Sequence, residues 1–131
     1  MKRIACIGDN CVDYYDETGE SYPGGNPVNV SVYFQRLGSE SSYIGVVGND
    51  ENGEMIIDAL KKKNVDVSHV KVLEGNTSIT HVQRINGDRV FGDNDPGVTE
   101  PRPSTVQRRG TVWVVLPSNP LSSRRSPLRW P

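Results

Sequence analysis

Two stretches of this sequence carry residues that could bind a polar ligand, and the first begins with Gly24 and Gly25. Paired glycines allow positive φ and a close approach to the backbone. The next residues predict the start of a helix, with Asn26 as its N-cap and Pro27 at its first position. The N–H groups of a helix N-terminus and the Asn29 amide would suit a polyhydroxyl or anionic ligand. Such turns also commonly serve only to reverse the chain.

The second stretch is an acidic loop after the first predicted strand. Residues 3–7 are mostly apolar and predict a short buried strand, and Asp9 and Asp13 follow where that strand would leave its sheet. In open α/β sheets, ligands bind at the carboxyl ends of strands. The two carboxylates could accept hydrogen bonds from ligand hydroxyl groups, or they could be solvated acids of an Asx-rich turn.

The elements that must position these residues alternate between strands and helices. The spacing of Val28, Val32 and Leu37 predicts a helix that ends at Gly38. A second core strand is expected over 42–47, followed by a helix that ends in three lysines, 61–63, and then by a third strand after Val65. This alternation favours a parallel sheet.

Two further pairs of strands are predicted outside this alternation. Residues 13–16 and 21–22 flank a polar turn, and residues 77–85 and 88–91 flank Asn86-Gly87, a strong two-residue hairpin signal. Tyrosines in the first pair could stack on a ligand or simply pack, and His81 in the second could point into a site or into solvent.

The sequence changes character near residue 100. Residues 1–100 carry nine basic and 16 acidic side chains, a net charge of −7, whereas residues 101–131 carry six arginines, six prolines and no acid. Apart from 111–116, nothing in the last part has a helix or strand pattern. It could be a disordered basic tail that binds nucleic acid or membrane. We favour loss of the original reading frame, which would leave 101–131 as an aberrant, disordered tail.

Several classes of protein are disfavoured. No apolar run approaches the length of a transmembrane helix, and the basic start is followed too soon by Gly8-Asp9 for a secretory signal. Cys6 and Cys11 cannot build a disulfide framework, so we expect reduced thiols and a cytoplasmic location, and their spacing gives no metal site. The lysines at 61–63 complement a helix C-terminus, and we expect neither nucleic acid nor membrane as a partner.

The spacing of residues around the paired glycines resembles the first signature of the PfkB, or ribokinase-like, family of carbohydrate kinases. The signature requires paired glycines, a small residue or proline, an asparagine, a small residue, and two later glycines. The matching positions are Gly24, Gly25, Pro27, Asn29, Ser31, Gly38 and Gly48. The resemblance covers residues 1–100 as the N-terminal part of a kinase domain. It implies an α/β fold, with a partial, truncated ribokinase-like parallel sheet and a small β lid.

The resemblance also implies a substrate and the residues that bind it. The loop sequence around 8–13 and the segments 42–50 and 89–93 are similar to the branch of the family that phosphorylates fructosamines. Asp13 falls on the family carboxylate that binds sugar hydroxyls, and a small-molecule sugar or fructosamine is therefore the expected partner. The substrate-binding residues that we expect are Asp9, Asp13, Gly24, Gly25, Asn26, Asn29, Gln83 and Arg89. A homodimer through the β lid is a further possibility that the resemblance raises.

In the intact family, ATP and Mg²⁺ are the cofactors, and the base and anion hole come from a late Gly-Ala-Gly-Asp segment. This chain has no such segment and no P-loop Gly-Lys-Ser/Thr. We therefore expect a truncated phosphotransferase of the PfkB family that has no catalytic residue, binds neither cofactor and is inactive alone. The alternatives are a non-catalytic sugar-binding or lid-dimerisation module and, less favoured, a Rossmann-type dinucleotide-binding fragment, since G-x-G-x-x-G is missing.

Overall fold

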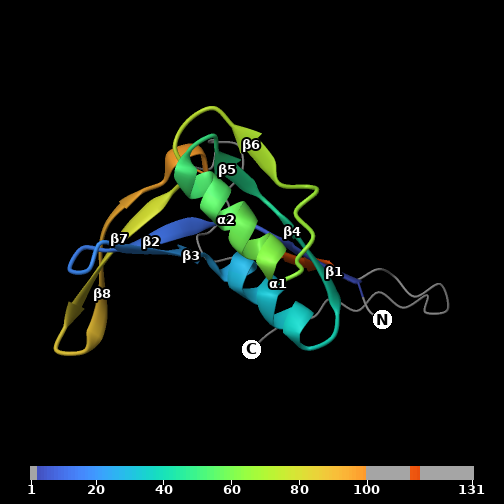
Figure 1. The fold of residues 1–131 in the computed structure, drawn as a ribbon, viewed down its shortest axis with the longest axis horizontal. Coiled ribbons are helices and arrows are strands. Elements are labelled where there is room, and N and C mark those ends of the chain that lie inside the picture. Colours follow the sequence, from blue (N-terminus) through green and yellow to red (C-terminus); the bar gives the residue numbers. More distant parts are fainter. Residues whose placement is uncertain (1–2, 100–112, 116–131) are drawn as a thin grey trace.

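The computed structural model describes residues 3–99 and 113–115, whose strands form three small sheets beside two helices (Figure 1). β1 (Arg3–Ile7) pairs in parallel with β4 (Glu40–Ile44), and β9 (Trp113–Val115) pairs antiparallel on the other edge of β1. β5 (Val46–Gly48) pairs in parallel with β6 (Lys71–Leu73). The predicted α/β fold with parallel core strands is therefore confirmed.

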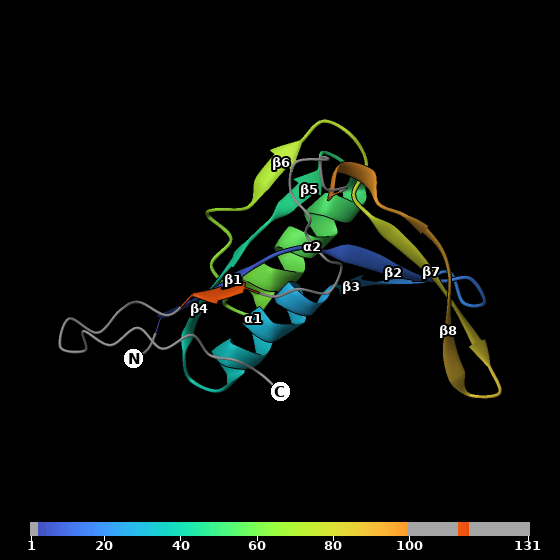
Figure 2. The ribbon, with the colours of Figure 1, turned by 180° about the vertical axis from the view of Figure 1, so that it is seen from behind.

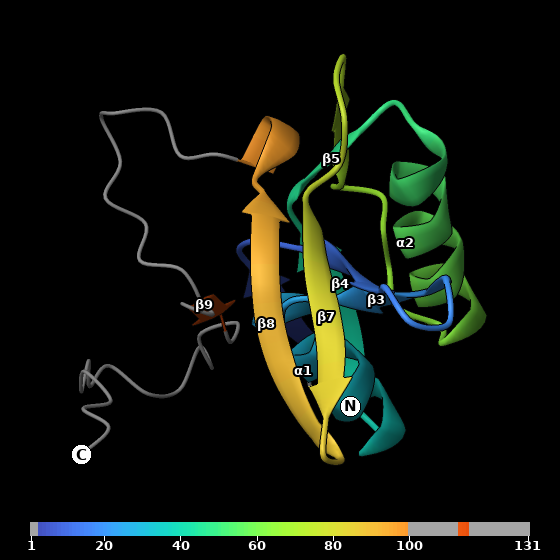
Figure 3. The ribbon, with the colours of Figure 1, turned by 90° about the vertical axis from the view of Figure 1, so that its left-hand side faces the viewer.

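The lid is a sheet of four strands that projects away from the helices (Figures 1 and 3). β2 (Cys11–Tyr15) and β3 (Glu20–Gly24) form one hairpin, and β7 (Ile79–Ile85) and β8 (Asp88–Asp95) form the other. Parallel pairing of β2 with β7 joins them in the order β3-β2-β7-β8. The first hairpin and β8 are longer than predicted, whereas β7 begins two residues later than predicted. The turn between β7 and β8 has the positive φ angles, 53° and 83°, that its Asn-Gly sequence favours.

The first helix, α1 (Asn26–Arg36), begins one residue earlier than predicted. Gly25 is its N-cap, with φ of 102°, so Asn26 is already helical and the prediction of Asn26 as the cap was wrong. The reason is that glycine can take this positive φ and turn the chain directly into the helix without a capping side chain. The predicted end is confirmed, because Gly38 leaves the helix with φ of 86°.

The buried face of α1 differs in part from the predicted stripe. Val28 is buried as expected, but Leu37 is 81% exposed at the C-terminal end of the helix. Ser31 takes its place inside, where its hydroxyl donates to the Val28 carbonyl oxygen and its own carbonyl oxygen accepts from the Ser41 hydroxyl at 2.6 Å. A short polar side chain lets α1 lie close to β4.

The predicted strand over 42–47 is two strands that are separated at Gly45. A Cβ at Gly45 would collide with the hydroxyl of Tyr43, whose ring fills the interior at this point. The second helix, α2 (Glu51–Lys62), follows as predicted, and its N-cap is Asp50, whose side chain accepts from the Gly53 N–H at 2.9 Å. Neither helix of the described residues is long and apolar enough to cross a membrane.

The core is formed by side chains from both helices, from β4 and β5 and from β2, elements whose arrangement Figure 2 shows from behind. Burial of these side chains is the main force that holds α1 and α2 against the sheets. The buried cluster consists of Val12, Val28, Tyr43, Val47, Ile56, Leu60 and Val65. Because Val12 belongs to β2, the root of the lid is part of the same core.

The expectation of an aberrant, disordered tail over 101–131 lies largely outside the described residues. The described part is β9, which falls inside 111–116, the one segment there with a strand pattern. Its three residues pair with Ala5, Cys6 and Ile7 of β1. This short strand therefore joins the core sheet.

Candidate functional site

The two stretches with ligand-binding potential meet at the carboxyl end of β1. A Cβ built on Gly25 would lie 2.9 Å from the Cα of Asn10 and 3.0 Å from the carbonyl oxygen of Asp9. The β1–β2 loop thus crosses directly over the turn that begins α1. We expected Gly25 to leave space for a ligand, but the group that occupies this space is the loop backbone, and the missing side chain is what allows the two segments to meet.

Asp13 lies against the other glycine of the pair. A Cβ on Gly24 would lie 2.7 Å from Oδ2 and 3.1 Å from Oδ1 of Asp13, closer than real side chains pack. Gly24 is buried, whereas Asp13 is only partly buried on β2. The carboxylate therefore sits in a recess that the glycine leaves, at the end of β1 and beside the first turn of α1. A carboxylate in this position can accept hydrogen bonds from more than one hydroxyl group.

Asn10 follows Asp9 in the β1–β2 loop, and its side chain turns into the interior. It is 2% exposed, and its Nδ2 donates to the Tyr43 hydroxyl at 2.8 Å and to the Val46 carbonyl oxygen at 2.7 Å. The Tyr43 hydroxyl donates in turn to the carbonyl oxygen of Gly8 at 2.9 Å. Asn10 and Tyr43 therefore hold the loop in place, a role that the sequence pattern did not indicate.

The Asp9 side chain has a buried oxygen that accepts no hydrogen bond from a described residue. Among the described residues, no group donates to the buried Oδ1 of Asp9 or to the buried Oδ1 of Asn10. Buried acceptors without a partner are uncommon in folded proteins, and a hydroxyl donor would satisfy them. Asp9 thus adds hydrogen-bonding capacity to the loop that carries Asp13.

Cys11 is a component of this loop that we did not predict as a site residue. Its thiol donates to Oδ1 of Asp13 at 3.4 Å. Burial and the neighbouring negative charge of Asp13 raise the pKa of Cys11 to about 12, so the thiol stays protonated at neutral pH. It therefore serves as a weak hydrogen-bond donor to Asp13 and not as a nucleophile.

Both asparagines that we expected at the start of α1 lie in its first turn, with Asn26 inside the helix and not at its cap. Asn26 and Asn29 are exposed in the first turn of the helix, beside the glycine pair. The cap has no side-chain hydrogen bond, and the N–H of Asn29 donates to the carbonyl oxygen of Gly25 at 3.1 Å. The exposed amide side chains and the positive end of the helix dipole border the recess of Asp13.

Gln83 and Arg89, the two lid residues that we predicted to bind substrate, do not lie beside Asp13. Asp13 pairs with Thr80 of β7, and side chains alternate along a strand, so Gln83 lies on the opposite face of the lid. Binding of the sugar by Gln83 therefore stays a prediction, and it would require contact with the lid face opposite Asp13. Arg89 pairs with Arg84 on the face of Asp13, but it lies about 13 Å further along the strand, near the hairpin turn. Both side chains are exposed.

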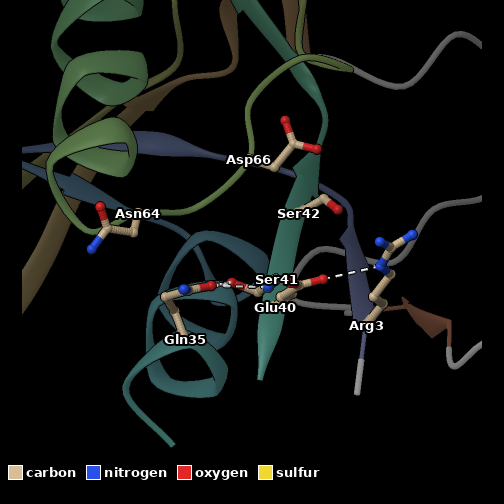
Figure 4. A pocket seen from close by; sticks show the side chains of 7 residues that line it. All are labelled: Arg3, Gln35, Glu40, Ser41, Ser42, Asn64 and Asp66. Atoms are coloured by element: carbon tan, nitrogen blue, oxygen red, sulfur yellow. Dashed lines mark hydrogen bonds and ion pairs between the residues drawn. The ribbon is translucent and has the colours of Figure 1, made fainter. Parts of the chain in front are cut away.

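Two cavities that are lined by described residues lie elsewhere. One, of about 300 Å³, lies on the lid face opposite Asp13, where Tyr14 and His81 line it. The other, of about 480 Å³, lies at the far end of β4 (Figure 4), and its lining residues are Arg3, Gln35, Glu40, Ser41, Ser42, Asn64 and Asp66. There the Arg3 guanidinium is bound to Glu40 at 3.0 Å, and Ser41 is bound to Gln35. These two pairs use part of the polar groups that line the larger cavity.

Within the described part of the chain, no cluster of three or more His, Cys, Asp or Glu side chains is arranged to hold a metal ion.

Comparison with known proteins gives consistent matches. A profile described as "pfkB family carbohydrate kinase" matches residues 1–115. Fructoselysine 6-kinase of Escherichia coli K12 is 45% identical over 98 residues, which are 75% of this chain and 38% of that protein. Fructosamine kinase FrlD of Bacillus subtilis 168 is 43% identical over 103 residues, which are 78% of this chain and 36% of that protein. The chain thus spans little more than a third of the length of these relatives.

Solved structures agree with the fold. A fructokinase from Xylella fastidiosa with bound ATP superposes with a TM-score of 0.63 at 25% identity, over 69% of this chain and 29% of that one. A sugar kinase, PH1459, from Pyrococcus horikoshii in complex with ATP gives a TM-score of 0.59 at 38% identity. The match covers 66% of this chain and 32% of that one. The predicted likeness to ribokinase-like sugar kinases is confirmed.

Proposed function

Because this chain belongs to the pfkB family of carbohydrate kinases, we propose that it carries the sugar-binding portion of an ATP-dependent fructosamine kinase. The observation that supports this most directly is the carboxylate of Asp13 in the recess left by Gly24, beside the start of α1. The similarity to fructoselysine and fructosamine kinases supports a fructosamine as the substrate. The free thiols of Cys6 and Cys11 support the cytoplasm as the location.

In this proposal, Asp13 and Asp9 accept hydrogen bonds from the sugar hydroxyls. Charge-assisted bonds of this kind are among the stronger ones in proteins, and they orient the hydroxyl that is to be phosphorylated. The exposed amides of Asn26 and Asn29 can both donate and accept at the border of the recess. ATP, when bound to the complete kinase, supplies the phosphoryl group.

The test is a titration of the isotope-labelled chain, with nuclear magnetic resonance as the readout. Fructoselysine, fructose and lysine are added in separate titrations. We expect fructoselysine to shift the amide signals of Asp13, Gly24, Gly25 and the first turn of α1. Asp13→Ala should weaken this binding roughly five- to 150-fold, the cost of one or two lost hydrogen bonds to a polar ligand. Asp16→Ala is the matched control, since Asp16 follows β2 and bonds His81 on the lid. Unchanged affinity in Asp13→Ala would refute the site.

A second expectation is that this chain alone does not transfer phosphate. Phosphoryl transfer depends on a base and on groups that stabilise the transferred phosphate, and the sequence contains no Gly-Ala-Gly-Asp segment that would supply them in this family. An assay for ADP release with fructoselysine and Mg-ATP should give the background rate. Turnover that survives purification and disappears in Asp13→Ala would contradict this expectation.

A second copy of the chain is the partner that we propose for the lid. β8 is the outer strand of its sheet and is exposed along its whole length. Phe91 is 64% exposed and Ile85 is 52% exposed, so apolar side chains lie beside an open strand edge. Open edges of this kind favour pairing with another strand, which supports a homodimer through the lid.

A further inference from the structure

The base of the β7–β8 hairpin is closed by its own hydrogen bonds. The chain enters the hairpin through Asn76 and leaves it through Asp95, and the Asn76 side chain donates to Oδ2 of Asp95 at 3.0 Å. Beyond the hairpin, the N–H of Val98, in the short η1 helix (Gly97–Thr99), donates to the carbonyl oxygen of Asn76 at 2.9 Å. The two ends of the hairpin are thus held together where they meet the core.

Asp50 attaches this base to the second helix. Its Oδ1 accepts from the Thr77 hydroxyl at 2.6 Å, and its Oδ2 accepts from the Thr77 N–H at 2.9 Å. The same carboxylate caps α2 by accepting from the N–H of Gly53. Thr77 is fully buried, and its hydroxyl oxygen also accepts from the N–H of Gly48 at 2.9 Å. One aspartate and one threonine therefore connect the N-terminus of α2 to the first residues of the lid strand.

Two glycines allow the backbones to meet at this point. A Cβ on Gly48 would overlap the carbonyl oxygen of Gly75 and would lie 2.6 Å from the Thr77 nitrogen, and a Cβ on Gly53 would overlap the carbonyl oxygen of Gly48. Three segments of main chain therefore pack against one another with no intervening side chain. Such a contact leaves little freedom for the base of the lid to shift.

The contact continues from Thr77 to the candidate sugar site. The next residue, Ser78, accepts from the N–H of Val12 at 2.8 Å, and Thr80 then pairs with Asp13. Pairing with β7 thus helps to position Asp13, and Thr77 attaches the start of β7 to the core. We propose that Asp50 and Thr77 are positioning residues. They fix the base of the β7–β8 hairpin, which we call the pivot of the lid, and thereby hold Asp13 at the sugar site.

The electrostatics of Asp50 agree with this arrangement. Burial alone would raise the pKa of Asp50, but the hydrogen bonds from Thr77 and Gly53 outweigh it and hold the pKa below its ordinary value. The carboxylate is therefore charged at neutral pH, and charged acceptors form the stronger hydrogen bonds.

Hydrogen exchange of the complete chain tests the pivot without any ligand. In Thr77→Val, which keeps the shape and removes the hydroxyl, we expect amides of β7 and β8 to exchange roughly five- to 150-fold faster, while amides of β1 and β4 keep their rates. Thr77→Ser should restore the parental rates, because it keeps the hydroxyl. Asp50→Asn should resemble Thr77→Val without loss of α2, since asparagine also caps helices. Thr18→Val, in the exposed β2–β3 turn, is the matched control.

The same variants are then titrated with fructoselysine. This part rests on the proposed function, and we expect Thr77→Val to bind more weakly than Thr77→Ser. Unchanged exchange of the lid in Thr77→Val, or equal acceleration in β1 and β4, would overturn the pivot. Faster lid exchange in Thr77→Val, together with a parent chain that binds no fructoselysine, would support the pivot and refute the proposed function.

Discussion

Replacement of Gly25 by valine is expected to abolish sugar binding and to lower the free energy of unfolding by about 2 to 6 kcal/mol. The first contribution is the backbone, because φ of 102° is strained for a β-branched residue by about 1 to 3 kcal/mol. The second is overpacking, again about 1 to 3 kcal/mol, since even the Cβ would press on Asn10 and Asp9. Relief of this contact would move the β1–β2 loop away from α1 and carry Asp9 with it.

Gly38→Val separates the two contributions. Gly38 also has a positive φ, 86°, but a Cβ there would have no atom within 4 Å, so only the backbone strain should remain. Chemical denaturation of both variants gives the difference, and the fructoselysine titration should fail only for Gly25→Val. Equal destabilisation of the two, with binding intact in both, would show that the crossing of the loop over the turn is not needed.

Tyr43→Ala should destabilise the chain by about 3 to 5 kcal/mol, the usual cost of removing a large buried aromatic side chain. Tyr43 is the largest of the fully buried side chains, and its ring lies in the cluster that joins both helices to the lid. Tyr43→Phe keeps the ring and should cost only about 1 to 3 kcal/mol, the penalty for leaving buried polar partners unpaired. Those partners are the amide of Asn10 and the carbonyl oxygen of Gly8.

Urea denaturation of both Tyr43 variants measures this difference, and Tyr33 provides the control. Tyr33 is 61% exposed on the outer side of α1, so Tyr33→Ala should change stability little. If Tyr43→Phe were as stable as the parent, the hydroxyl would not hold the β1–β2 loop, and its bond to Asn10 would not explain why the Asn10 side chain is buried.

The sequence was sufficient for the features that depend on local chemistry. The helix that ends at Gly38, the second helix with its C-terminal lysines and the Asn86-Gly87 turn follow from residue types at neighbouring positions, and the structure agrees with each. The cap of the second helix by Asp50 was not predicted. The resemblance indicated Asp13 and the glycine pair separately as site residues, and their contact is a finding of the structure.

The features that were missed depend on contacts between distant segments. Whether Gln83 shares a face with Asp13 is decided by the register of β7 against β2, which local patterns do not define. The inward turn of Asn10 depends on Tyr43, 33 residues later. The strand break at Gly45 likewise reflects the space that the Tyr43 ring occupies. A glycine inside a strand pattern can indicate such a break, although we predicted one continuous strand.

The parallel pairing of β2 with β7 also has a consequence for the order of folding. Val12 pairs with Ile79, and the chain between them contains both helices and the strands β4, β5 and β6. Contacts so distant in sequence form slowly, because the intervening chain must first be brought together. During synthesis, β2 and β3 can form their hairpin early, whereas β7 emerges only after the whole core segment. We therefore expect the helices to pack first and the β2–β7 pairing, which fixes Asp13, to form last. The sugar site would then be complete only at the end of folding.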